Sequence, residues 1–395
     1  PLMKDLEFKG GAVYFDAAVN DSRLVLENII NARKSGAVLL NYAEIVSFRF
    51  KGKKINQVEV RDNISKSYFF IQAKVIVNAA GPWADSVLNM QAKKHKPLLR
   101  PTKGVHFLLK RQVLNVKQAV VINSSQDKRL VFVIPWEKYI LVGTTDTEFN
   151  GDLDHVFAQK RDIDYLLKQL NFYFPSAKIT YDHIISAYAG VRPLVAQRKS
   201  NVSAISRQDA IIQSRTGMIT VAGGKLTTYR SMAFKTVKIA CMYLKKRYGA
   251  YFPAKDITKS SLKNEGISKD DLAKLSGLLE SSEKADYLGT QYGTGLKHII
   301  KIIEKDPVLK KTIAEDIPFI LAQAVYCARY EMCICLTDFY RVNTCIYLWD
   351  PDHGRNTLSE VGLLFKEELN WSLDEFERQK KDYLDFIKEN EGWRM

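Results

Sequence analysis

The chain has 395 residues, of which 46% are hydrophobic and 26% charged, a composition typical of a folded globular protein with two or three domains. We expect no signal peptide in residues 1–9, and no apolar run approaches the roughly 18 residues that span a bilayer. The net charge of +15 is compatible with nucleic acid, an anionic membrane surface or anionic small molecules, but no nucleic-acid-binding signature is present.

The first 97 residues mix helix and strand signals. Strand patterns occupy residues 10–16, 37–50, 57–61, 67–72 and 74–78, and two of them face each other across a polar turn at 62–65. A helix is predicted from Asp21, a suitable N-cap, to Lys34. Another helix starts near Ala84.

The middle of the chain is rich in strands and its end is rich in helices. Short strands at 105–109, 118–122, 130–135 and 139–144 predict a mostly antiparallel sheet, followed by a helix at 161–173 and strands at 184–190 and 203–213. After residue 251, helical periodicity covers 270–279, 286–292, 296–304, 320–336 and 373–389. The fold class is therefore α/β interleaved with an antiparallel sheet, followed by an all-α domain.

Residues 219–232 carry the clearest local signal for a site. A buried strand at 219–222 runs into Gly223 and Gly224, and Thr227 or Thr228 can cap the next helix. That helix is predicted to have an apolar face made by Ala233, Val237, Ala240 and Leu244. Unpaired N–H groups at its start suit an anion or a polar ring edge, and Lys225 adds a positive charge. The alternative is an ordinary strand–helix connection.

A second crossing of the same kind occurs at residues 74–83, where a buried strand runs into Gly81-Pro82-Trp83. No Gly-x-Gly-x-x-Gly follows a strand anywhere in the sequence. If the chain is part of a dinucleotide enzyme, we therefore expect its phosphate-binding unit to lie outside this sequence.

The five cysteines form no regular framework, and an odd count predicts free thiols in a reducing compartment. Cys333-x-Cys335 has the wrong spacing for a zinc knuckle, so packing is the expected use and no metal site is predicted.

A series of motifs then points to one family. The motifs are Asn20-Asp21-Ser22-Arg23-Leu24, Val77-Asn78-Ala79-Ala80-Gly81-Pro82-Trp83, Lys103-Gly104-Val105-His106, Phe132-Val133-Ile134-Pro135-Trp136, Gly143-Thr144-Thr145-Asp146, Gly190-Val191-Arg192-Pro193-Leu194, Ser206-Arg207 and Gly223-Gly224-Lys225-Leu226-Thr227-Thr228-Tyr229-Arg230. In this order they resemble the FAD-dependent glycerol-3-phosphate dehydrogenases, the membrane-associated flavoproteins of glycerol catabolism.

The helical tail resembles that family less closely. Ala328-Arg329-Tyr330-Glu331-Met332 stands where the family usually has Arg-His-Glu-Met, and the family's paired arginines after Asp-Phe are here reduced to a displaced Arg341. The family also begins with a glycine fingerprint well before the point that matches Pro1. We therefore expect the first half of the FAD-binding domain to be missing from this chain.

The resemblance implies a fold and its boundaries. It indicates an FAD-binding domain of the glutathione-reductase-like, amino-acid-oxidase type. We expect the rest of this domain at 1–97 and 216–250, an antiparallel substrate-binding domain at 98–215, a linker at 251–263 and a helical domain at 264–395.

The resemblance also implies oxidation of sn-glycerol 3-phosphate to dihydroxyacetone phosphate, with hydride transfer to flavin N5. Arg192 and Arg207 would bind the phosphate, since arginine matches phosphate oxygens with two bonds. His106 would be the base or would bind the substrate hydroxyl. Structural salt bridges and a hydrogen-bonded cleft histidine are the plain alternatives.

The remaining candidates are cofactor contacts. Lys225, with the backbone around Gly223, Gly224, Leu226 and Thr227, would face the flavin and the substrate. Gly81, Pro82 and Trp83 would approach the adenosine half of FAD, although packing is an equal possibility for Trp83.

The expected partners follow from the same resemblance. Electrons would pass to a membrane quinone, and the chain would lie on an anionic membrane surface. This would be the cytoplasmic face of the inner membrane or, in a eukaryote, the mitochondrial inner membrane. A homodimer is one expected assembly, and no nucleic-acid partner is expected. The alternatives are a glycerophosphate oxidase using oxygen, a related amino-acid oxidase, or a non-catalytic chain that docks with a separate flavin-binding polypeptide.

Overall fold

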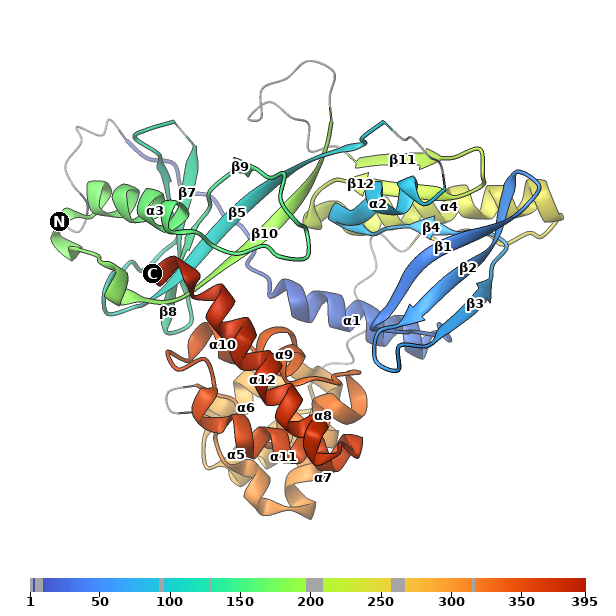
Figure 1. Cartoon of the computed structure of the whole chain (residues 1–395). Coiled ribbons are helices and arrows are strands. Elements are labelled where there is room, and N and C mark those ends of the chain that lie inside the picture. The colour runs from blue at the N-terminus through green and yellow to red at the C-terminus, as the bar shows by residue number, and fades with distance from the viewer. Residues whose placement is uncertain are drawn as a thin grey trace.

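The computed structural model describes Met3 and residues 10–91, 96–127, 129–196, 209–256, 267–314 and 317–395. Three β-sheets lie side by side above a bundle of helices, and the bundle comes from the last third of the chain (Figure 1). The predicted combination of an α/β part, an interleaved antiparallel sheet and a C-terminal helical part is confirmed.

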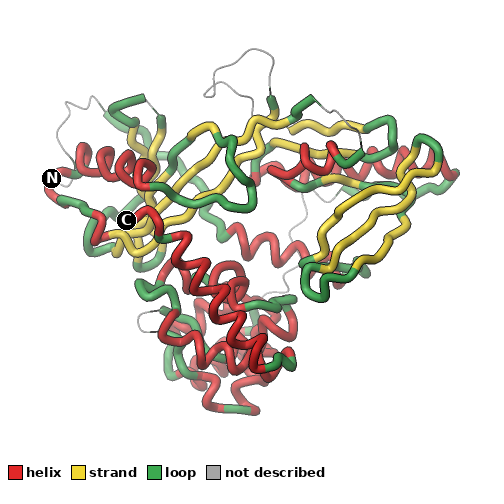
Figure 2. The backbone as a smooth tube through the Cα atoms, in the orientation of Figure 1, coloured by secondary structure: helices red, strands yellow, loops and turns green. Residues whose placement is uncertain are grey.

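The largest sheet has six strands in the order β10-β5-β8-β7-β6, with β9 paired to β5, and all its pairs are antiparallel. Its strands are β5 (Leu99–Lys110), β6 (Val120–Asn123), β7 (Leu130–Trp136), β8 (Tyr139–Gly143), β9 (Thr147–Glu148) and β10 (Ile184–Val195). The two long strands β5 and β10 stay paired from Leu99 and Val195 to Leu109 and Ile184 (Figure 2).

Alternation along β5 sends its side chains into two different cores. Val105 and Phe107 belong to the same core as α3 (Lys160–Tyr173), and Lys103 on that face forms a buried ion pair with Asp162 at 2.7 Å. Leu108, on the opposite face, packs into the helical bundle. His106 shares this second face, further from the bundle end of the strand.

Two smaller sheets complete the α/β part. The strands β1 (Ala43–Lys51), β2 (Lys54–Asp62) and β3 (Tyr68–Gln72) form an antiparallel meander. In the other sheet, β12 (Ile219–Gly223) pairs antiparallel with β11 (Asp209–Gln213) and parallel with β4 (Val77–Asn78). The helices α2 (Ala84–Asn89) and α4 (Tyr229–Tyr248) follow β4 and β12. Although β11 lies inside the range expected for the substrate-binding domain, it pairs with β12.

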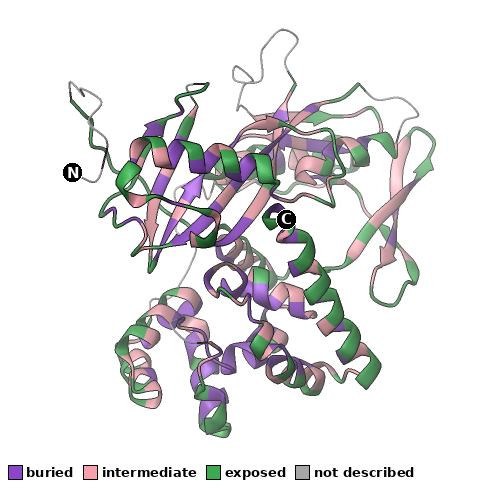
Figure 3. Cartoon of the chain, turned by 60° about the vertical axis from the view of Figure 1, so that its left-hand side comes forward, coloured by how far each residue is buried: buried purple, intermediate pink, exposed green. Residues whose placement is uncertain are grey.

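The helix α1 (Asp21–Lys34) lies between the sheets and the bundle (Figure 1). The bundle consists of α5 (Lys269–Leu279), α6 (Ser282–Tyr292), α7 (Leu296–Lys305), α8 (Ala322–Tyr330), α9 (Leu336–Asp338), α10 (Ile346–Trp349), α11 (Leu358–Leu369) and α12 (Leu373–Asn390). Its buried residues line the interior (Figure 3), with Ile299 and Ile303 of α7 almost fully enclosed. After α12, Trp393 enters the core that the six-stranded sheet shares with α3.

Several local predictions differ from the structure. Residues 10–16 form no strand, and Phe15 is fully exposed, because a short alternating segment needs a partner strand to bury its apolar side. The helix predicted at 320–336 ends at Tyr330, where Glu331 turns into the bundle and Met332 takes a positive φ of 55°. Val237 is 50% exposed, so it does not lie on the buried side predicted for α4. Residues 203–208 of a predicted strand lie outside the described residues.

Candidate functional site

The parallel pairing of β4 with β12 brings the two glycine turns to the same edge of one sheet. Val77 pairs with Ile219 and Asn78 with Thr220, so both strands end on the same side. The turn after β4 begins a 3₁₀ segment at Gly81–Trp83, and the turn after β12 leads into one at Leu226–Thr228. The Gly81–Trp83 segment also contacts β10, which carries Arg192. The topology thus gathers most of the residues that the sequence singled out.

A buried amide holds the first turn. The Asn78 Nδ2 group donates to Ala84 O at 3.0 Å, and its Oδ1 accepts from Ala80 N at 3.2 Å. Gly81 takes a positive φ of 56°, and a Cβ at this position would meet nothing within 4 Å. The Trp83 indole donates to Asp154 at 2.9 Å and remains 40% exposed. The backbone at Gly81 is therefore open to a ligand, and Trp83 has a structural partner as well.

The second turn is also exposed. Gly223 and Gly224 both have positive φ, of 73° and 81°, which glycine adopts without steric cost. Lys225, Leu226 and Thr227 are exposed, and α4 follows them directly. Thr228 Oγ1 donates to Lys225 O at 3.0 Å and accepts weakly from Lys225 N at 3.4 Å. An uncovered helix start of this kind can face an anion or a ring edge.

Arg192 lies in β10, outside the sheet that carries the two glycine turns. Its Nη2 donates to Thr144 Oγ1 at 2.8 Å, and both terminal nitrogens donate to Thr145 O at 3.3 Å. Nη1 also pairs with Asp146 Oδ1 at 3.2 Å, with both side chains about one quarter exposed. The guanidinium is thus held in place while remaining partly open to solvent.

His106 sits on the same face of the sheet as Arg192. Its ring stacks on Tyr188 with centroids 5.2 Å apart and planes inclined by 13°. Burial, together with the positive charge of Arg192, lowers the pKa of His106 from 6.5 to about 4. At neutral pH the imidazole is therefore neutral and able to accept a proton.

Several residues of this face were not singled out from the sequence. Tyr188 stacks on His106, and Gly143, noted only as part of a motif, faces the same ring, since a Cβ there would lie 2.6 Å from His106 Cγ. Thr144 and Asp146 were noted only as part of a motif, yet both bind Arg192. The pairing of β5 with β8 and β10 places these residues together, and no spacing within the sequence shows it.

Arg207 lies outside the described residues, so its role as a phosphate ligand stays a prediction.

A cavity of about 470 Å³ adjoins the first turn. It is lined by Pro82, Trp83, Gly190, Arg341 and Phe386, among others.

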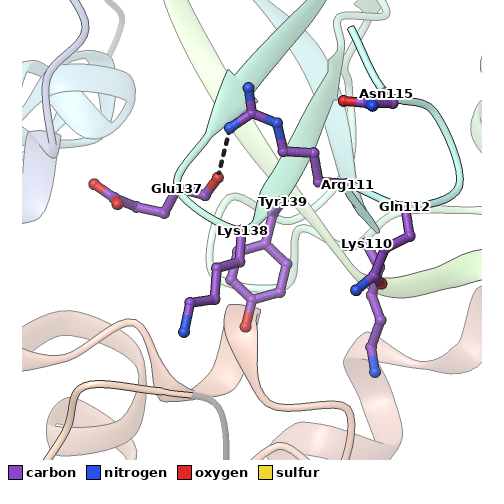
Figure 4. Close-up of a pocket in the computed structure, with 7 residues that line it drawn as sticks. All are labelled: Lys110, Arg111, Gln112, Asn115, Glu137, Lys138 and Tyr139. Carbon is purple, nitrogen blue, oxygen red and sulfur yellow. Dashed lines mark hydrogen bonds between the residues drawn. The ribbon is translucent and has the colours of Figure 1, made fainter. Parts of the chain in front are cut away.

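A separate cavity of about 450 Å³ lies at the other end of β5. It is lined by Lys110, Arg111, Gln112, Asn115, Glu137, Lys138 and Tyr139 (Figure 4). Arg111 donates to the Glu137 carbonyl at 3.3 Å, and the Tyr139 hydroxyl donates to Trp349 O at 2.8 Å. This cavity shares no residue with the face that carries His106 and Arg192.

Comparison with known proteins identifies the family. The family model described as FAD dependent oxidoreductase matches residues 1–230. The chain belongs to the FAD-dependent oxidoreductase family. A second model, the C-terminal domain of alpha-glycerophosphate oxidase, matches residues 214–376 of this oxidoreductase chain.

The chain is similar to several named glycerol-3-phosphate dehydrogenases. The chain is 33% identical over 355 residues to an aerobic glycerol-3-phosphate dehydrogenase of Staphylococcus saprophyticus, and 34% identical over 351 residues to one of Staphylococcus epidermidis. It also resembles the crystal structure of the Bacillus halodurans glycerol-3-phosphate dehydrogenase complexed with FAD, with a TM-score of 0.85, 28% identity and coverage of 98% of this chain and 77% of that one. The chain spans only 62% of the length of the two staphylococcal relatives.

The open backbone of this oxidoreductase chain fits the family's cofactor. At Gly190, as at Gly81, a Cβ would meet nothing within 4 Å, so space remains next to the face that carries Arg192 and His106. The exposed helix start at Leu226–Thr228 can offer N–H donors to the polar edge of a flavin ring. The glycines, the donors and the basic residues therefore suit FAD.

Proposed function

We propose that this chain carries the substrate-binding part of an enzyme that oxidises sn-glycerol 3-phosphate to dihydroxyacetone phosphate with FAD. The observation that carries the proposal is the arrangement of Arg192 and His106 on one face of the sheet, an anion-binding group next to a neutral base. The names of the staphylococcal and Bacillus relatives support the same substrate.

Each residue has a distinct part in the proposed reaction. Arg192 binds the phosphate through its planar fork, and Arg207 is a second candidate for the same group. His106 binds the C2 hydroxyl or accepts its proton, since the ring is neutral at neutral pH, and its lowered pKa makes it a weaker base than an ordinary histidine. FAD, when bound, supplies the acceptor for the hydride that leaves C2. Stacking on Tyr188 fixes the orientation of the His106 ring.

The residues at the two turns would hold the cofactor. Lys225, with the backbone from Gly223 to Thr227, would face the flavin ring, and its charge would favour an electron-rich ring. Gly81, Pro82 and Trp83 would contact the adenosine half. The proposed domain limits are 1–97 and 216–250 for the FAD-binding domain and 98–215 for the substrate-binding domain. Residues 251–263 would form the linker and 264–395 the helical domain.

The electron acceptor and the location belong to the same proposal. A membrane quinone would take the electrons, and oxygen is the alternative acceptor. The net charge of +15 would attract the chain to an anionic membrane surface. Among the described residues, no helix is both long and apolar enough to cross a bilayer. Sedimentation with anionic and with neutral vesicles tests the surface contact, which should be lost in high salt.

The test of the function uses the whole chain incubated with FAD. A visible flavin spectrum that is bleached by sn-glycerol 3-phosphate, and not by glycerol or L-proline, supports the proposal. A bound flavin that sn-glycerol 3-phosphate leaves oxidised contradicts it.

A second candidate function is docking to a separate flavin-binding polypeptide. Apolar side chains are exposed on three elements, namely Val25 and Ile29 of α1, Val77 of β4, and Val237 and Met242 of α4. Exposed apolar side chains that gather into one patch mark interaction surfaces. A colourless chain that becomes yellow and active only when such a polypeptide is added would favour this candidate.

A further inference from the structure

Two glycines form the floor beneath the two proposed functional side chains. A Cβ at Gly104 would lie 2.7 Å from the guanidinium carbon of Arg192, and a Cβ at Gly143 would lie 2.6 Å from His106 Cγ. Neither glycine has a positive φ, so backbone conformation does not require glycine at these positions. The requirement is steric: both side chains lie flat against bare backbone.

Three consecutive residues hold the guanidinium from the side. Thr144 Oγ1 and Thr145 O accept hydrogen bonds from Arg192, and the Asp146 carboxylate adds an ion pair at 3.2 Å. These acceptors follow β8 directly, and β8 is paired with β5 opposite His106. A charged donor held by several acceptors keeps one orientation, since each bond that involves the charge is stronger than a neutral one.

The strand pairing explains why Gly104 and the acceptors at residues 144–146 all contact the Arg192 guanidinium. Gly104 of β5 lies directly opposite Gly190 of β10, and Thr102 lies opposite Arg192. The Arg192 side chain therefore runs over its cross-strand neighbours and reaches the space above Gly104. There it comes close enough to His106 for its charge to act on the imidazole.

We propose that Gly104, Thr144 and Asp146 are positioning residues that hold the Arg192 guanidinium flat over β5, and thereby fix where a phosphate group binds relative to His106. This inference rests on the proposed function for the identity of the anion. The position of the guanidinium itself rests on the contacts alone.

The decisive variant is Gly104→Ala. Its methyl group must push the guanidinium away, and a flexible arginine can move without unfolding the strand. The matched control is Gly190→Ala, in the residue directly opposite, where a Cβ meets nothing within 4 Å. The two variants add the same methyl group to the same strand pair, and only one of them displaces Arg192.

The first measurement is the titration of His106 by NMR in the whole chain without added ligand. The charged or titratable groups near His106 include Arg192 and Tyr188 of β10 and Asp146 after β8. Asp21 at the start of α1 and Cys345, just before α10, act on Tyr188. Moving the Arg192 charge away should raise the pKa of His106 in Gly104→Ala by about one unit and leave it unchanged in Gly190→Ala. An identical pKa in wild type and Gly104→Ala would overturn the inference.

The second measurement is the binding of sn-glycerol 3-phosphate by calorimetry. Thr144→Val removes one acceptor from Arg192 and should weaken binding about tenfold, while Thr144→Ser keeps the hydroxyl and should restore it. If Thr144→Val binds as tightly as wild type, Thr144 is not a positioning residue.

The two measurements separate the failure of this inference from failure of the proposed function. A His106 pKa that shifts in Gly104→Ala, in a chain that binds no sn-glycerol 3-phosphate, supports the positioning and contradicts the substrate. Thermal unfolding of each variant, compared with Gly190→Ala, shows whether a change is local. If Gly104→Ala unfolds, the binding of sn-glycerol 3-phosphate by Thr144→Val and Thr144→Ser tests the positioning of Arg192 by itself.

Discussion

At the scale of single residues, burial and one neighbouring charge determine the behaviour of His106. The ring lies between Tyr188, Gly143 and the backbone of β5, and its protonated form would be desolvated and repelled by Arg192. Sequence reasoning could name His106 as a base because of its residue type. It could not show that the ring is neutral, since the cause lies in strands that are distant along the chain.

The pH dependence of stability tests this protonation state. The pKa of His106 is about 4 in the folded chain and 6.5 when unperturbed, so the unfolded chain binds the proton more tightly between these values. The stability that the neutral ring provides is complete above pH 6.5 and falls as the pH drops towards 4. This loss is at most about 3.5 kcal/mol, from about 1.4 kcal/mol per pKa unit over the difference between 6.5 and about 4.

The variant for this prediction is His106→Asn, measured by denaturant unfolding at several pH values. Wild type should lose more stability than His106→Asn between pH 6.5 and 4. Glu391, whose pKa is lowered to about 2 mainly by its hydrogen bond with His353, titrates at lower pH and affects both proteins equally. Parallel curves for the two proteins between pH 6.5 and 4 would contradict a neutral buried imidazole.

Arg192→Lys tests the anion-binding role. Lysine keeps the charge but cannot offer the planar fork or occupy the bonds to Thr144 and Asp146 in the same way. We expect the affinity for sn-glycerol 3-phosphate to fall by about 10- to 100-fold. Lys235→Arg is a suitable control, because that exposed lysine of α4 pairs with Asp209. Unchanged affinity in Arg192→Lys would remove this residue from the phosphate site.

At the scale of elements, regular patterns were predictable and contact-dependent breaks were not. The helices at Asp21–Lys34 and Lys160–Tyr173 and the sheet strands β5, β6, β7, β8 and β10 follow from apolar periodicity and turn residues, whereas the short strand β9 was not predicted. The predicted helix at 320–336 fails because Glu331 is buried by partners that lie elsewhere in the sequence. The helix α11 (Leu358–Leu369) was missed altogether.

Those partners form a network that joins α1 to the bundle. Arg23 Nη1 donates to Glu331 Oε1 at 2.5 Å, and Asn343 donates to Glu331 Oε2 at 2.9 Å. Arg23 also pairs with Glu27 on its own helix. The region where the family's paired arginines are replaced thus supplies Asn343 to this network, while Arg341 lies over the ring of Phe386.

Glu331→Gln should therefore destabilise the chain by about 3 kcal/mol, because it leaves the buried charge of Arg23 without its main counter-ion. Glu27→Gln is the matched control, since this carboxylate binds the same guanidinium but is 23% exposed, and we expect a loss below about 1 kcal/mol. Denaturant unfolding measures both. Equal losses would show that the buried Glu331 pair contributes no more to stability than the partly exposed Glu27 pair.

At the scale of the whole molecule, the last residues connect the bundle to the six-stranded sheet. Trp393 is almost fully buried in the core that the sheet shares with α3, and Arg394 donates to the carbonyls of Ile184 and Ile185 at 2.9 and 3.0 Å. Glu391 binds both His353 and Arg355 in the bundle. One short segment therefore has contacts on both sides, and the two parts should unfold together.

Trp393→Ala tests this coupling. The substitution should lower the free energy of unfolding by about 3–5 kcal/mol, and it should also divide unfolding into two transitions, because it removes the largest side chain that the end of the bundle places in the sheet core. Trp371→Ala is the matched control, since Trp371 packs against the core of the bundle. That variant should be destabilised while keeping a single transition, as followed by calorimetry and hydrogen exchange. If Trp393→Ala also unfolds in one transition, the packing of Leu108, Tyr139 and Ile185 of the sheet in the core of the bundle is sufficient to couple the two parts.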